Sequence, residues 1–445
     1  MNVAATDSAS VSVTEEAAIK KAFRYLVPWL MLFYVLAYID RINIGFAALT
    51  MNAELGLTFA MFGIANTAFY VMFSLFEVPS NMMLAKYGAR VWIPRIMITW
   101  GLASIATMFA VGPYSLYALR ALVGLAEAGL LPGIVYYMGY WFPQKHRARA
   151  NAIFLAALPL SLMIGSPLSG LILQMDGFLG LAGWRWLFII EGVPSVLLGF
   201  AVYFILPERP KNARWLSEEE KTALQTRMDK EHAVAPPMVG KRPATKWQEV
   251  RSFKILALAV SYFCILATAN SLGIWAPLIV KELLGNTERY VLVGFVTAIP
   301  PLFAMFAMQW VSRNSDRLNE RTWHTVISMA LGALGWMIVA LTASPYTKML
   351  GLTLCFVGTY SAMCVFWAMA AHTLSRQSQA VGIALISSIG TLASMISPTI
   401  IGYLRERTEN FNAGIWYTTI LLLLGVTLMV FAARRAANAA TPVNP

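Results

Sequence analysis

Charged residues are scarce in this sequence, and so are cysteine and histidine. Only 13% of the 445 residues are charged, whereas 58% are hydrophobic and the mean hydropathy is +0.62. The three cysteines lie inside long hydrophobic runs and form no paired framework, which argues against disulfides and against a metal site: Cys264, Cys355 and Cys364. The four histidines lie in or beside polar loops, which argues against a histidine proton relay in an apolar core: His146, His232, His324 and His372.

Motifs of enzymes are also missing. No hydrophobic run carries a His or Cys/His pair, and no loop carries a glycine-rich phosphate-binding motif or the motif of a catalytic nucleophile. We therefore expect no enzyme, no metal and no cofactor. A receptor would usually need a large domain outside the membrane, but the one long polar segment has fewer than roughly 50 residues, which argues against a receptor. The net charge of +12 is spread over short loops rather than gathered in one patch, so it predicts membrane orientation and not nucleic-acid binding.

Twelve hydrophobic runs are long enough to cross a bilayer, which takes about 20 residues of helix. We therefore predict an all-α integral membrane protein with 12 transmembrane helices in two six-helix halves. The N-terminal tail is polar and lacks the features of a cleavable signal, so we expect it to be unstructured over residues 1–18. The predicted divisions are a tail (1–24), a six-helix bundle (25–206), a central loop (207–252), a second bundle (253–434) and a C-terminal tail (435–445).

The distribution of lysine and arginine predicts the orientation of the chain. The tails, alternate loops and the central loop contain 26 of these residues, the opposite loops contain six, and the remaining two are Arg41 and Arg120. Basic residues accumulate on the cytoplasmic side, so both termini and the central loop are predicted to be cytoplasmic. Within the central loop, SEEEKTALQTRM has a helix cap and helical spacing, which predicts a short amphipathic helix at the membrane face.

The two halves resemble each other. RARANAIFLAALPLSLMIGSPLSG in the first half has a counterpart in the second, RQSQAVGIALISSIGTLASMISPTIIG, and both runs lead from a basic segment to Ser-Pro and then Gly. The loop AKYGAR likewise has a counterpart in SDRLNER. Duplicated halves with polar groups near the midplane and interrupted helices indicate a secondary transporter that alternates access by rocking one half against the other.

The fourth predicted span, YALRALVGLAEAGLLPG, carries Arg120 and Glu127 at membrane depth. Seven residues are about two helical turns, so both side chains leave the same face, roughly 10 Å apart, with Gly124 between them. A charge at this depth costs at least about 2.5 to 3.5 kcal/mol, so such residues normally face a bundle interior or a water-filled cavity. This face is therefore a candidate functional site, with a structural ion pair between helices as the alternative.

The first span, which contains YIDRINIGFAAL, has Asp40 and Arg41 side by side. Helical spacing places Tyr38 on the face of Arg41, and Asp40 about 100° away from it. Arg41 and Arg120 have similar predicted depths, and two guanidinium groups suit recognition of a carboxylate. Glu127, balanced between burial and a nearby arginine, can exchange a proton as its exposure changes, which proton coupling requires. The alternative is a self-neutralised pair of Asp40 with Arg41. In span six, Glu191 is close to Arg185, so local pairing near the surface competes with a functional role.

The chain resembles a major facilitator superfamily transporter over nearly its full length, and within that superfamily the anion:cation symporters, such as sugar-acid, tartrate and phthalate permeases. The residues that carry this resemblance are YIDRINIGFA, FEVPSN, YALRALVGLAEAG, GIVYYMGYWFP, RARA, GWRWLFIIEGVPS and SDRLNER.

The resemblance implies roles for particular residues. Arg41 and Arg120 would bind the substrate carboxylate with help from Tyr38, and Asp40 and Glu127 would carry protons. Asn270 and Trp367 are the corresponding candidates in the second half. Ala85 replaces an acid that is usual after span two, so the predicted cytoplasmic gate consists of other charged residues: Glu77, Arg90, Asp316 and Arg317. Thr391 stands where some sugar-acid permeases have asparagine, which leaves a smaller dicarboxylate or an aromatic acid open.

These observations predict proton-coupled uptake of a small organic carboxylate such as a dicarboxylate, a tartrate-like acid, an aromatic acid or a sugar acid. The proton gradient would replace any cofactor. The resemblance also implies the inner membrane of a bacterium, with the lipid bilayer, protons and the organic anion as partners. Nothing in the sequence demands more than a monomer. The alternative is an efflux antiporter of the same fold for lipophilic or cationic compounds.

Overall fold

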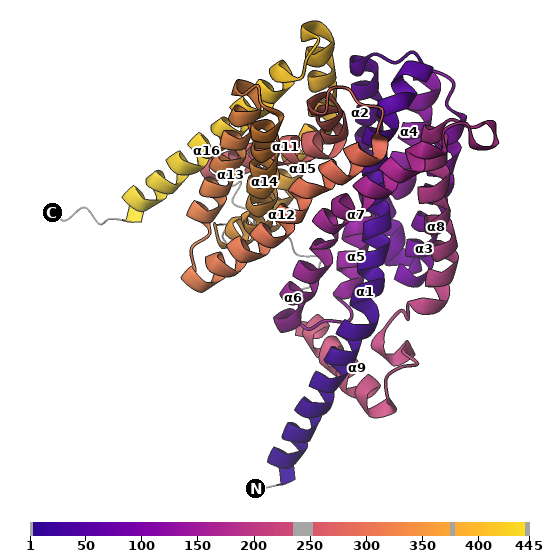
Figure 1. Cartoon of the computed structure of the whole chain (residues 1–445). Helices are drawn as coiled ribbons and strands as arrows, with labels where there is room; N and C mark the ends of the chain where they lie inside the picture. Colours follow the sequence, from indigo (N-terminus) through magenta and orange to yellow (C-terminus); the bar gives the residue numbers. More distant parts are fainter. Residues whose placement is uncertain (1–2, 235–251, 374–378, 441–445) are drawn as a thin grey trace, which may run out of the picture.

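The computed structural model describes residues 3–234, 252–373 and 379–440, and within these ranges every regular element is a helix (Figure 1). Twelve helical segments in them are long and apolar enough to cross a membrane, six before and six after the central segment. The predicted all-α architecture with two six-helix halves is confirmed. Parts of the predicted central loop and C-terminal tail, 235–251 and 441–445, lie outside the described residues.

The helices of the two halves follow one another with short connections. The first half consists of α1 (Val3–Glu54), α2 (Phe59–Tyr87), α3 (Ala89–Ala106), α4 (Pro113–Glu127), α5 (Leu130–Met138), α6 (Gln144–Leu155), α7 (Ala157–Ile172) and α8 (Gly183–Ile205). The central segment contributes α9 (Glu218–Val234), and the second half consists of α11 (Phe253–Leu283), α12 (Tyr290–Leu318), α13 (Thr322–Leu341), α14 (Pro345–Thr373), α15 (Gln379–Thr408) and α16 (Asn412–Ala440).

The fourth span is interrupted between α4 and α5. Gly129 lies there with φ of 90°, a conformation that residues with a side chain rarely adopt. A Cβ at this position would also lie 2.6 Å from the Ser80 hydroxyl of α2. Both constraints favour glycine, and the resulting break redirects the chain directly after Glu127.

The end of the molecule that carries the two chain termini is here called the terminal side, and the opposite end is called the distal side. The two halves meet at the distal side. Two close backbone approaches join the halves there. A Cβ on Gly402 would lie 2.2 Å from the Phe59 carbonyl oxygen, and one on Gly170 would lie 2.5 Å from that of Tyr290. Small residues permit this packing of membrane helices. In Figure 1 the ribbons of the two halves diverge from this junction toward the terminal side.

Within the described residues, the hydrogen bonds and ring contacts that join the halves lie on the distal side or at mid-depth. Examples are the backbone N–H of Ala60 donating to Glu406 at 3.2 Å and the Lys281 ammonium donating to the Leu49 carbonyl at 3.3 Å. The Phe59 ring adds contacts to Trp275 and Phe411 across the same junction. The protein is therefore held in a state closed on the distal side.

The N-terminal tail differs from the expected unstructured segment. Helix α1 begins at Val3, and its N-terminal part packs against α9 (Figure 1). Lys21 pairs with Glu220 at 2.7 Å, and Arg227 approaches Glu15 at 3.7 Å. Ser217 and Glu220 form the predicted cap of α9, because each accepts a hydrogen bond from the other's backbone N–H. Ion pairs with α9 therefore order a segment whose polar sequence predicts no structure by itself.

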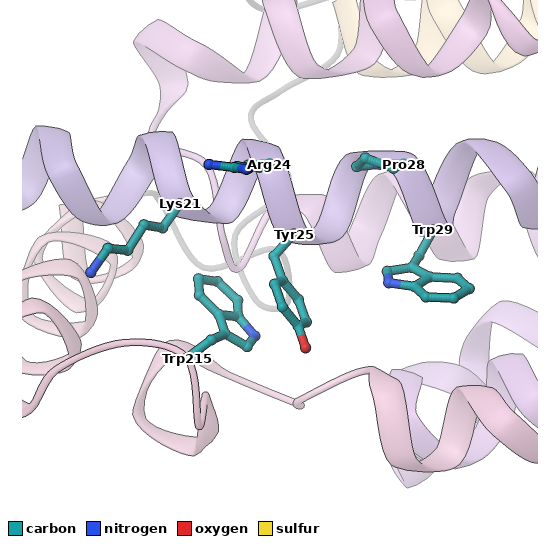
Figure 2. A pocket seen from close by; sticks show the side chains of 6 residues that line it. All are labelled: Lys21, Arg24, Tyr25, Pro28, Trp29 and Trp215. Carbon is teal, nitrogen blue, oxygen red and sulfur yellow. The ribbon is translucent and has the colours of Figure 1, made fainter.

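Aromatic residues anchor the base of α1 to the chain before α9. Figure 2 shows Lys21, Tyr25 and Trp29 projecting from one side of α1, toward the segment that carries Trp215. The rings of Tyr25 and Trp215 stack with centroids 4.9 Å apart. These residues line a shallow pocket at the terminal side, separate from the buried charges at mid-depth.

Candidate functional site

An ion pair between α1 and α4 forms the centre of the candidate site. The Arg41 guanidinium donates to the Glu127 carboxylate, and the Glu127 side chain is 3% exposed while that of Arg41 is 17% exposed. Asp40, although adjacent to Arg41 in the chain, is not its partner. The helical spacing predicted this separation, and the alternative of a self-neutralised Asp40–Arg41 pair is not what the structure contains.

Both predicted substrate-binding arginines lie over one aromatic ring of α2. The Cζ atoms of Arg120 and Arg41 lie 4.8 Å and 5.6 Å from the centroid of Phe69. Arg41 also lies 5.8 Å from the ring of Tyr38, the predicted assisting residue. Favourable interaction of a cation with a ring face holds the two guanidinium groups in one region of the first half.

Arg120 differs from Arg41 because it has no acidic partner. Its side chain is only 2% exposed, and within the described residues it has neither an ion pair within 4 Å nor a hydrogen bond. The Nε atom is buried without any partner. A buried guanidinium with unused donors can bind the carboxylate of a small molecule.

Gly124 brings α4 against α2 at the ring shared by the arginines. A Cβ on Gly124 would lie 2.1 Å from the carbonyl oxygen of Phe69. Any larger residue would therefore push α2 away and move the ring on which both guanidinium groups lie. The glycine between Arg120 and Glu127 sets the spacing of the site.

Asp40 points away from the arginine pair and toward α3. Its carboxyl accepts hydrogen bonds from the Trp100 indole at 2.5 Å, the Ser104 hydroxyl at 2.5 Å and the Asn43 amide at 2.9 Å. Its exposed fraction is 2%. Asp40 and Glu127 thus occupy separate environments, one with three neutral donors and one with an arginine.

The second half contributes polar side chains that approach the first half at mid-depth. The Tyr70 hydroxyl of α2 donates to the Asn270 side-chain oxygen at 2.7 Å, and the Asn270 amide donates to the Ser394 hydroxyl at 2.6 Å. The structure therefore places Asn270 at the junction of the halves. Trp367 instead contacts Tyr262 of its own half, with its indole N–H donating at 3.3 Å.

The residues predicted to form a gate are not brought together in this state. Arg90 donates to the Tyr203 carbonyl at 3.0 Å and lies over the Tyr203 ring, while Asp316 pairs with Arg321 at 3.4 Å. Within the described part of the chain, Glu77 and Arg317 have no ion pair. All four lie toward the terminal side, where the halves diverge, so the structure leaves a gate there unassembled.

Glu191 is the residue whose surroundings differ most from the expectation. Arg185 pairs with Glu54 at 3.0 Å and not with Glu191. The Glu191 carboxyl is instead buried, and it accepts a hydrogen bond from Ser169 at 2.8 Å. Local pairing near the surface was therefore the wrong interpretation.

Sequence reasoning did not find the aromatic and hydroxyl residues around the charges. Polar and aromatic residues of this kind within apolar helices are usual for packing and give no signal of a site: Phe69, Tyr70, Trp100, Ser104 and Ser169. Only the charged residues that they contact could have drawn attention to them.

Comparisons with known proteins agree with this architecture. The family model described as Major Facilitator Superfamily matches residues 30–398. The chain belongs to the major facilitator superfamily. The predicted membership is confirmed, as is the expectation of a transporter rather than an enzyme.

Two relatives and one solved structure illustrate the similarity. A protein of Agrobacterium vitis named "Putative tartrate transporter" is 43% identical over 97% of this chain and 98% of its own. The "Quinolone resistance transporter" of Acinetobacter baumannii is 37% identical over 93% of this chain and 94% of its own. A bacterial homologue of the human lysosomal transporter Spinster, solved in an inward-facing and unoccupied conformation, has the same fold, with a TM-score of 0.73, 17% identity, and coverage of 93% and 97% of the two chains.

Proposed function

We propose that this superfamily member is a proton-coupled symporter that takes up a small organic carboxylate. The observation that carries the proposal is the buried guanidinium of Arg120, which has no acidic partner in the described residues and shares the Phe69 ring with Arg41. The name of the Agrobacterium vitis relative supports a tartrate-like dicarboxylate as the substrate class.

Competition for Arg41 would couple substrate to protons. A substrate carboxylate that binds between Arg120 and Arg41 must displace the Glu127 carboxylate from Arg41. An unpaired carboxylate at this depth is costly, and taking up a proton from water makes it neutral. Substrate binding and protonation of Glu127 then favour each other, and release of both restores the Arg41–Glu127 pair.

Asp40 is the second proposed proton carrier. It accepts hydrogen bonds from three neutral donors and has no ion pair within 4 Å in the described residues, although the charge of Arg120 also acts on it. Tyr38 and Asn270 would assist substrate binding from the two halves. Trp367 is a more distant candidate, and the four gate residues would meet when the terminal side closes.

The orientation and location follow from the same proposal. The basic side of the chain carries the termini, so these would be cytoplasmic in the inner membrane of a bacterium. The distally closed state would then be open toward the cytoplasm. A monomer is sufficient, because each half supplies its part of the site within one chain.

Ligand stabilisation of the purified protein tests the anion site. A panel of dicarboxylates, aromatic acids and sugar acids is compared with cationic and neutral amphiphiles by the shift of the thermal unfolding midpoint. One class of carboxylates should stabilise the wild type but not Arg120→Ala, and Arg120→Lys should retain only part of the effect because it lacks the planar fork.

Arg95→Ala is the matched control, because Arg95 also lies over an aromatic ring of the first half, 4.7 Å from that of Trp92, and is outside the site. Its response should equal that of the wild type. Stabilisation by cationic or lipophilic compounds alone would favour the efflux antiporter, which the name of the Acinetobacter baumannii relative keeps as the alternative. That result would contradict the proposed anion site.

A further inference from the structure

Glu191 of α8 is a buried carboxyl that the proposed cycle does not use. It is 4% exposed, and its Oε1 atom accepts one hydrogen bond, from Ser169 of α7. Its Oε2 atom is buried without a hydrogen-bond partner. A carboxylate needs several donors or a cation to remain charged inside a protein, and the hydrogen bond that this carboxyl accepts comes from a neutral hydroxyl.

The elements that pack around Glu191 bring no positive charge to it. Helix α1 contributes Asp40 and Asn43, and α7 contributes Ser169. Helix α3 approaches the next residue, Gly192, with Gly101 and Ile105, neither of which titrates. Within the described residues, Asp40 is thus the charged group that acts on Glu191, and it has the same sign.

Asn43 lies between the two acids. Its amide donates to the Asp40 Oδ1 atom at 2.9 Å, and its side chain lies close to the Glu191 carboxyl. The Asn43 Oδ1 atom is buried without a partner, like the Oε2 atom of Glu191. A proton on Glu191 would give both atoms a partner, because the acid O–H could donate to the amide oxygen.

We propose that Glu191 is a further proton-binding site, which holds a proton in the distally closed state and is linked to Asp40 through Asn43. The link is a chain of two hydrogen bonds, in which the Glu191 hydroxyl donates to the Asn43 oxygen and the Asn43 N–H donates to Asp40, and the amide itself neither gains nor loses a proton. Two charged carboxylates on either side of one amide repel each other, so ionisation of one favours protonation of the other. The proton enters from water and returns to it. This inference rests on the proposed proton coupling and extends it to a third carboxyl.

Infrared spectroscopy tests the protonation state independently of transport. The wild-type protein near pH 7 should show a C=O stretching band of a protonated carboxyl that is lost in Glu191→Gln. Glu218→Gln is the matched control, since the Glu218 side chain is 89% exposed, and it should retain the band. An identical band in wild type and Glu191→Gln would show that Glu191 is charged and would overturn the inference.

Ser169→Ala provides a second test should Glu191→Gln fail to fold. It removes the hydroxyl that donates to Glu191 at 2.8 Å, so the band should move to a higher wavenumber without disappearing. An unmoved band would assign the protonated acid elsewhere and contradict the proposal.

The pH profile of uptake in proteoliposomes tests the link to Asp40. With Glu191→Gln the like charge can no longer form, so the midpoint of the profile should move to lower pH while substrate exchange is retained. A profile identical to the wild type would reduce Glu191 to a structural acid. If the wild type shows no proton dependence at all, the proposed function fails, whereas the infrared band still decides the protonation of Glu191.

Discussion

Gly124→Ala tests whether contact between α2 and α4 sets the geometry of the site. The added Cβ would lie 2.1 Å from the Phe69 carbonyl oxygen, where ordinary contacts begin at 3.4 Å, so α2 must retreat by about 1.3 Å. Overpacking of this kind costs about 1 to 3 kcal/mol. The retreat also moves the Phe69 ring away from Arg41 and Arg120, which weakens two cation–ring contacts of about 0.5 to 1 kcal/mol each.

The assay combines the thermal unfolding midpoint in detergent with uptake in proteoliposomes. We expect a lower midpoint and uptake reduced about tenfold or more, since about 1.4 kcal/mol corresponds to a factor of ten. Gly273→Ala is the matched control. Its Cβ would meet only the Ile42 Cγ2 atom at 3.7 Å, an ordinary contact, so stability and uptake should be preserved. Wild-type stability and uptake in Gly124→Ala would refute the argument from close packing.

Two further predictions concern the junction of the halves and the N-terminal helix. Tyr70→Phe removes the 2.7 Å hydrogen bond to Asn270, worth about 0.5 to 1.5 kcal/mol, so the ratio of distally closed to distally open molecules should fall by about 2- to 10-fold. Labelling of a cysteine introduced on the distal side measures this change, and unchanged labelling would contradict it. Burial acts to raise the pKa of Glu220, but hydrogen bonds from Lys21 and Ser217 outweigh it and hold that pKa below its usual 4.5. The contribution of Glu220 to the α1–α9 contact is therefore complete above pH 4.5 and is lost as the pH falls through the lowered pKa. Glu220→Gln should weaken the α1–α9 contact by at most about 1 kcal/mol, because Lys21 is 51% exposed, and should therefore increase proteolysis of α9 modestly at pH 7. Glu219→Gln, which changes an exposed residue, should have no effect.

The spans and the depth of the charges could be predicted because hydrophobic length and helical spacing are local properties. Hydrophobic length predicts the twelve spans. Helical spacing predicts that Asp40 and Arg41 point in different directions and that Arg41 and Arg120 lie in one region. The helical N-terminal segment could not be predicted, because its order comes from ion pairs with α9, some 200 residues later in the chain.

Partner choice among buried charges also could not be read from the sequence. Arg185 and Glu191 are close along one helix, yet the fold brings Glu54 to Arg185 and turns Glu191 toward α7. Arg41 had Asp40 and Glu127 as possible partners, and the choice depends on the rotation of α1, which directs Arg41 toward α4 and Asp40 toward α3. Such choices depend on how helices rotate against one another, which apolar periodicity constrains weakly when a helix is buried on several sides.

Proton-driven accumulation by the Glu127→Gln variant tests the central claim most directly. Purified wild type and variant are reconstituted in proteoliposomes, and uptake of the carboxylate identified by the stabilisation panel is followed with and without an imposed proton gradient. Glutamine keeps the shape of the site but cannot release a proton, so the variant should exchange substrate across the membrane and fail to accumulate it. Undiminished proton-driven accumulation by Glu127→Gln would contradict the exchange of Arg41 between Glu127 and the substrate.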